Sequence, residues 1–85
     1  MSHIQVILNP VVQKLTLAYA AQKPETVCIF IKDSIGQALY SEEVMMEDGF
    51  TIMEILELQH FTPGIYTLEL QKADRLFYTH RLIKN

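Results

Sequence analysis

Apolar residues recur at every second position through much of this chain. The clearest case spans residues 66–70, where Tyr66, Leu68 and Leu70 are separated by Thr67 and Glu69. Because successive side chains of a β-strand point to opposite faces, a period of two is typical of a strand that buries one face. The pattern predicts a chain built from strands packed on one side.

Seven segments carry a strand pattern, with turn signals between them every ~8–12 residues, the spacing of an antiparallel sandwich. The expected strands are residues 4–8, 15–19, 27–31, 37–44, 51–58, 66–70 and 76–83. The segment 27–31 is apolar on both faces, as a central strand requires. The sequence therefore predicts an all-β fold, an immunoglobulin-like antiparallel β-sandwich of about seven strands. One domain covers residues 1–85, because a chain of this length supports a single thin core.

One segment, residues 51–60, fits two structures. Met53, Glu54 and Leu56 are good helix formers, whereas strand alternation through Ile52, Leu56 and Leu58 fails only at Glu54. Pattern alone leaves helix and strand both open here.

Charge and composition exclude several classes of function. The net charge is -3, and Lys and Arg do not cluster before residues 81–84, so the basic surface of a nucleic-acid binder is missing. The chain has no stretch of ~18 apolar residues for a membrane helix and no signal-peptide pattern at its start. Cys28 is the only cysteine and cannot form an internal disulfide; its apolar neighbours predict a small packed side chain.

The residues that carry chemistry do not form a recognisable site. His3, His60 and His80 lack metal-ligand spacing, and no serine lies in a Gly-x-Ser-x-Gly setting. The carboxylate pairs at residues 42–43 and 47–48 predict a solvated face, because no spaced Asp/Asn/Gly loop for Ca²⁺ accompanies them. We therefore expect no catalytic residue, no metal site and no cofactor.

Two local motifs have clear structural explanations. Asp33 and Gly36 bound a tight turn, since Asp caps its own backbone and Gly is free to take positive φ. After the breaker Pro63-Gly64, Tyr66 opens a strand, and its hydroxyl is expected to reach back to a backbone group as in a tyrosine corner.

The order of motifs along the chain resembles the type A C-terminal sorting domains of type IX (Por) secretion. The matching motifs are Asn9-Pro10, Leu15-x-Leu17, the strand ending in Asp33 with Gly36, Leu56-x-Leu58, Gly64-x-Tyr66 and the basic end Arg81-Leu82-Ile83-Lys84. One departure is Leu8, which stands where the family often has an aromatic residue. The resemblance favours a strand over residues 51–58.

The resemblance implies a non-catalytic module that directs a passenger protein across the outer membrane. It implies an upstream passenger, the secretion translocon and a sortase-like protein as partners, with no nucleic acid and no membrane insertion. It also implies transit through the periplasm, as part of a longer precursor, to the medium or the cell surface. The terminal segment Arg81, Leu82, Ile83, Lys84 and Asn85 is the expected signal, and Asn9, Pro10, Gly36, Gly64 and Tyr66 are expected to maintain the fold.

A carbohydrate-binding or adhesive β-sandwich is the alternative, because such domains share this architecture. They stack sugars on exposed aromatic rings, and here Tyr40, Phe77 and Tyr78 are the candidates. A planar row of exposed aromatic rings would favour this function. An aromatic-poor surface with a protruding C-terminal strand would favour the sorting function.

Overall fold

A computed structural model describes residues 3–9, 13–73 and 75–85. The elements are β1 His3–Asn9, β2 Lys14–Ala21, β3 Glu25–Lys32, β4 Ala38–Met46, β5 Gly49–Ile55, the 3₁₀ helix η1 Glu57–His60, β6 Gly64–Lys72 and β7 Arg75–Lys84. Each of the seven expected strands is present, most of them longer at their ends than the alternation suggested.

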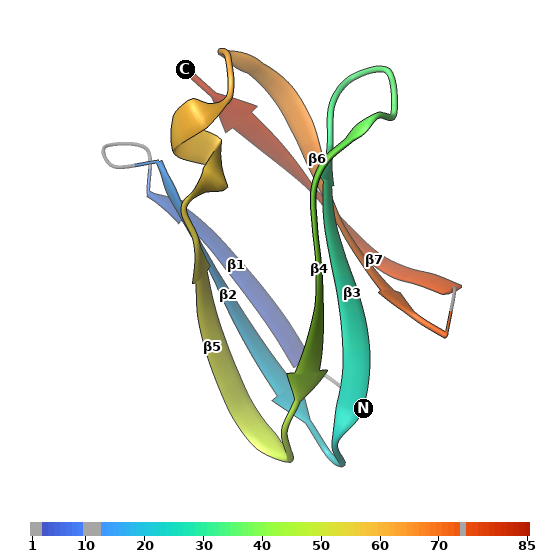
Figure 1. Cartoon of the computed structure of the whole chain (residues 1–85). Helices are drawn as coiled ribbons and strands as arrows, with labels where there is room; N and C mark the ends of the chain where they lie inside the picture. The colour runs from blue at the N-terminus through green and yellow to red at the C-terminus, as the bar shows by residue number, and fades with distance from the viewer. Residues whose placement is uncertain (1–2, 10–12, 74) are drawn as a thin grey trace.

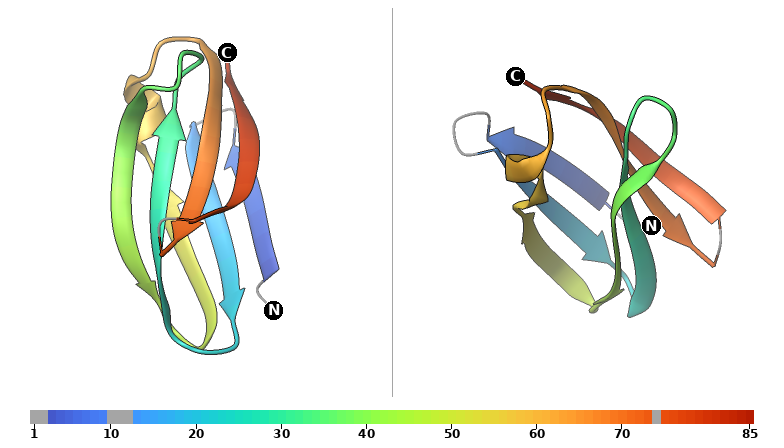
Figure 2. Two further views of the ribbon diagram at one scale, coloured as in Figure 1. Left: turned by 90° about the vertical axis from the view of Figure 1, so that its right-hand side faces the viewer. Right: turned by 45° about the horizontal axis from the view of Figure 1, so that its top comes forward.

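The strands form two antiparallel sheets that stack face to face (Figures 1 and 2). One sheet has the order β1-β2-β5, and the other has the order β4-β3-β6-β7. The chain crosses between the sheets at β2 to β3, at β4 to β5 and through η1 to β6. This is the predicted immunoglobulin-like sandwich, with β3 inside the four-stranded sheet as its apolar sequence required.

The core is built from the inward positions of both sheets, as expected for aligned sandwich packing. Leu15, Leu17 and Tyr19 of β2 are fully buried, opposite the inward residues of β3 and β6. The buried residues of β3, β6 and β7 are Val27, Ile29, Ile31, Tyr66, Leu68, Leu70 and Leu82. Fully burying such a side chain contributes about 1.5–3 kcal/mol, so the alternating pattern supplies the main force for folding.

The segment 51–58 is a strand only as far as Ile55, and the prediction of a strand to residue 58 is wrong at its end. Glu57–His60 form a 3₁₀ helix, and Leu58 enters the core from that helix rather than from a strand. The inward face of β5 is also the opposite one from that expected: Ile55 is buried, whereas Ile52 is 67% exposed. Pairing with β2 sets this face, because Leu17 aligns with Met53.

The turn between β3 and β4 has the predicted chemistry. The Asp33 carboxylate accepts hydrogen bonds from the backbone N–H of Ile35 at 3.1 Å and of Gln37 at 2.9 Å. Gly36 takes a φ of 87°, which an L side chain adopts only with strain. This hairpin lies at the same end of the sandwich as the C-terminus (Figure 1).

Candidate recognition surface at the last strand

The expected signal segment is held in the sheet along its length rather than projecting from it. β7 is an edge strand, and its residues 81–84 pair with residues 64–67 of β6 in continuous register. Asn85 follows directly and is exposed. The C-terminus therefore does not protrude as a free strand.

Two residues of this segment also belong to the fold. The Leu82 side chain is 1% exposed and lies in the core beside Tyr66, its partner on β6. The Lys84 ammonium donates hydrogen bonds to the backbone oxygens of Leu58 at 2.6 Å and of Phe61 at 2.7 Å. Leu58 lies within η1, where its oxygen also accepts the backbone N–H of Phe61, and Phe61 is the residue that ends η1. Lys84 therefore fastens the end of β7 to the crossing between the sheets.

The other residues of the segment face outward. Ile83 pairs across the strands with Ile65, and both lie on the outer face of the four-stranded sheet with 56% and 52% of their surface exposed. Arg81 lies on the same face, opposite Thr67, and is exposed. Within this segment, Leu82 therefore packs in the core and Lys84 holds the end of β7 against η1. Arg81 and Ile83 face outward, and their side chains are exposed for contact with a partner.

The tyrosine corner is present as predicted. Tyr66 is largely buried at the start of β6, and its hydroxyl donates a hydrogen bond to the backbone oxygen of Thr62, four residues upstream. The ring also packs against Phe61, with 5.0 Å between the ring centroids. The corner therefore fixes the loop that leads from η1 into β6.

The remaining motif residues have different roles. Asn9 is the last residue of β1, and Pro10 lies outside the described residues. Gly64 opens β6 without a positive φ, and a Cβ there would meet only the Tyr66 ring at 3.9 Å, an ordinary contact. The role of Gly64 in maintaining the fold therefore stays a prediction. Of the two predicted turn glycines, only Gly36 takes a conformation that favours glycine.

A second polar cluster joins the sheets near their other end. The Tyr19 hydroxyl donates to a carboxylate oxygen of Glu25 at 2.7 Å, and the Lys72 ammonium lies 3.0 Å from the same oxygen. The hydrogen bond from Tyr19 is the main reason that the pKa of Glu25 lies below its usual value, and Lys72 adds to this effect while burial opposes it. The Lys72 ammonium also lies 4.5 Å from the ring centroid of Phe77. These contacts join the two sheets and engage the Glu25 carboxylate in a hydrogen bond and an ion pair.

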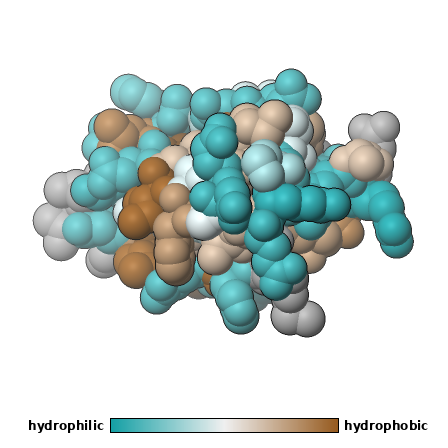
Figure 3. All heavy atoms as spheres, turned by 90° about the horizontal axis from the view of Figure 1, so that it is seen from below, coloured by the Kyte–Doolittle hydropathy of each residue, from teal (hydrophilic) through white to brown (hydrophobic). Residues whose placement is uncertain are grey.

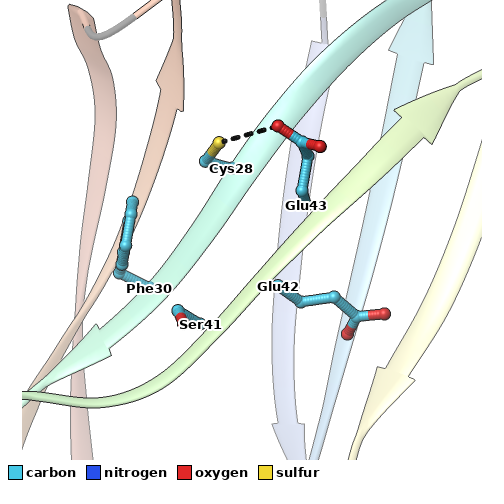
Figure 4. Close-up of a pocket in the computed structure, with 5 residues that line it drawn as sticks. All are labelled: Cys28, Phe30, Ser41, Glu42 and Glu43. Carbon is cyan, nitrogen blue, oxygen red and sulfur yellow. Dashed lines mark hydrogen bonds between the residues drawn. The ribbon is translucent and has the colours of Figure 1, made fainter.

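The outer face of β3 and β4 carries a shallow hollow around Cys28 and Phe30 (Figure 4). The Cys28 thiol is only half-buried and lies 3.9 Å from a carboxylate oxygen of Glu43, whereas Glu42 points away from it. Cys28 was expected to pack in apolar surroundings, but it lies on the outward face of the sheet. The residues that line the hollow include no cationic side chain, which a reactive thiolate typically has beside it.

The described residues contain no cluster of three or more His, Cys, Asp or Glu side chains able to hold a metal ion. The same part of the chain has no helix long and apolar enough to cross a membrane. His80 stacks on Tyr78 at the edge of β7 and is exposed.

The aromatic side chains do not form a planar exposed row. Tyr40, Phe77 and Tyr78, the three rings considered for stacking, are each half-buried. Burial and a hydrogen bond to Glu42 raise the pKa of Tyr40 above its usual range. Phe50 was not among the predicted stacking rings; it is 76% exposed on the three-stranded sheet, whose other aromatic residue in the described part of the chain, Tyr19, is buried.

Fold and surface together define a small immunoglobulin-like sandwich whose last strand is both part of the core and partly open to a partner. The family described as "Secretion system C-terminal sorting domain" matches residues 6–85, and the chain belongs to this family. Membership implies engagement with type IX secretion machinery, an upstream passenger and export across the outer membrane. No match was found among the curated proteins.

Proposed function

We propose that this chain is a non-catalytic sorting module whose last strand is read by the type IX translocon. The observation that carries the proposal is the family match over residues 6–85, joined to a final strand that leaves Arg81 and Ile83 exposed. The passenger crosses the periplasm with this domain attached, and a sortase-like protein then separates the two upstream of β1.

The arrangement of polar groups supports a role without chemistry. A reactive thiolate typically has a cationic side chain beside it, whereas the half-buried Cys28 donates to the Glu43 carboxylate at 3.9 Å and no cation lines its hollow. The carboxylate of Glu25 is engaged by Tyr19 and Lys72. What the surface offers is contact area on a rigid sheet, which suits recognition by another protein.

The test is export of a fluorescent reporter fused upstream of this chain and preceded by a signal peptide, in a host that has the pathway. We expect the reporter outside the outer membrane with the intact chain and in the periplasm when the chain is removed. The Arg81→Ala variant should reduce export while circular dichroism shows an unchanged fold, because the Arg81 side chain is exposed.

Retention of the intact fusion in the periplasm would contradict the sorting function. In that case, binding to immobilised polysaccharides would be measured next, since a carbohydrate-binding sandwich is the remaining alternative. Equal export of the intact and Arg81→Ala fusions would contradict only the assignment of Arg81.

A further inference from the structure

An exposed apolar pair lies at the end of the four-stranded sheet where the chain terminates. Ile65 and Ile83 are direct cross-strand partners on the outer face, while Tyr66 and Leu82, the next pair, face the core. Cross-strand neighbours have Cβ atoms about 4.5–5.5 Å apart, so the two isoleucines present one continuous apolar surface. The two members of the pair are 18 positions apart in the chain (83 − 65 = 18).

A cation without a partner borders this pair. Arg81 lies on the same face beside Thr67, and among the described residues its side chain forms no ion pair. The neighbouring cation, Lys32, is neutralised by Glu69 at 2.9 Å. The carboxylates of β4 lie at the opposite edge of the sheet, two strands away from β6.

We propose that the translocon component recognises a folded epitope, defined as Ile65, Arg81 and Ile83, rather than a linear C-terminal tail. This inference rests on the sorting function proposed above. The partner is a protein with an apolar surface that covers the two isoleucines and a carboxylate that pairs with Arg81. Lys84 is a positioning residue: it holds the end of β7 against η1 and does not contact the partner.

The charge and the residue types of the epitope favour a protein partner over a lipid surface. Segments that bind anionic lipid carry clusters of about four to eight cations, whereas this epitope has a single unpaired one. A central apolar anchor with one arginine is typical of the few residues that dominate a protein–protein interface. The epitope is small, so it constitutes one anchor of a contact that extends along the outer face of β6 and β7.

The experiment compares three epitope variants with two controls in the reporter-export assay. The epitope variants are Ile65→Ser, Ile83→Ser and Arg81→Glu. The controls are Ile52→Ser, an isoleucine of similar exposure on the other sheet, and Arg75→Glu, an exposed arginine at the far end of β7. The urea midpoint of each purified variant is measured alongside.

We expect each epitope variant to lower export about tenfold, with a urea midpoint equal to that of its control. Ile65→Ser is the decisive variant, because residue 65 is not part of the C-terminal segment. Export unchanged by Ile65→Ser but lost in Arg81→Glu and Ile83→Ser would show a linear signal and overturn the folded epitope. Equal losses in the Ile52→Ser control would also overturn it.

Two further results separate this inference from its alternatives. If the intact fusion is not exported, the sorting function fails and the epitope with it. If the intact fusion is exported and the purified domain binds vesicles containing phosphatidylglycerol through Arg81, a lipid surface replaces the protein partner. Absence of vesicle binding, together with the tenfold losses of export, supports a protein partner whose carboxylate pairs with Arg81.

Discussion

Replacing Lys84 with methionine tests whether the last strand fastens the crossing between the sheets. The substitution keeps an unbranched side chain and removes the ammonium, so the backbone oxygens of Leu58 and Phe61 lose this donor. The Leu58 oxygen keeps its hydrogen bond from the Phe61 N–H. A net hydrogen bond to a charged group contributes about 1.5–3 kcal/mol. Two such bonds, offset by up to about 2 kcal/mol for ordering the lysine side chain and by partial access of water, leave a loss of about 2 kcal/mol.

Urea unfolding followed by circular dichroism measures this loss. For a domain of this size the slope is about 1–2 kcal/mol/M, so the midpoint should fall by about 1–2 M while the slope stays unchanged. The control is Lys14→Met, which removes a lysine from a partly exposed ion pair with Glu54 and should cost less than about 1 kcal/mol. A midpoint for Lys84→Met no lower than that of Lys14→Met would refute the fastening role.

Two further predictions concern the tyrosine corner and the Glu25 cluster. Tyr66→Phe removes only the hydroxyl that bonds Thr62 and should cost roughly 1 kcal/mol in urea unfolding, or up to about 3 if the carbonyl is left unsatisfied; an unchanged midpoint would argue against the corner. Because the folded pKa of Glu25 is lowered, its contribution to stability is present near neutral pH and is lost as the pH falls through that pKa. The intact protein should therefore exceed Glu25→Gln in urea midpoint at about pH 7 and lose that advantage progressively as the pH is lowered below the usual pKa of a glutamate carboxyl; a constant difference would contradict the linkage.

Alternation predicted the strands well wherever one face is strictly apolar. The strands β2 and β6 were predicted correctly because only one face of each is strictly apolar. The buried leucines on these faces are Leu15, Leu17, Leu68 and Leu70. β5 was harder, since both of its faces carry apolar side chains and only pairing with β2 decides that Ile52 faces outward. Which face of β5 points inward depends on the neighbouring strand and cannot be read from the sequence of β5 alone.

The end of the 51–58 segment shows a different limit. Ile55 and Leu58 are both buried, and their spacing of three fits a strand running into a 3₁₀ helix as well as a continuous helix. The change occurs where the chain leaves one sheet for the other. Period alone does not reveal that crossing.

Motif order selected residues 81–85 as the expected signal, but it did not predict the different structural roles of these residues. The Lys84 ammonium donates hydrogen bonds to backbone oxygens that lie 26 and 23 positions earlier in the chain. Every residue has a backbone oxygen, so the sequence does not indicate which ones accept these bonds. The outward pairing of Ile83 with Ile65 required the register of β7 on β6. Arg81, by contrast, is exposed as its charge and its place near the end suggested.

The dependence of the core on the last strand has a consequence for protein synthesis. A chain interrupted before Leu82 lacks a core side chain, and one interrupted before Lys84 lacks the cation that holds η1. The outer face that pairs Ile65 with Ile83 forms only when the ribosome has completed β7. A translocon that reads this face would accept chains in which β7 is present and leave behind those interrupted before it, so the geometry of one edge strand would also serve as a check that synthesis has passed β7.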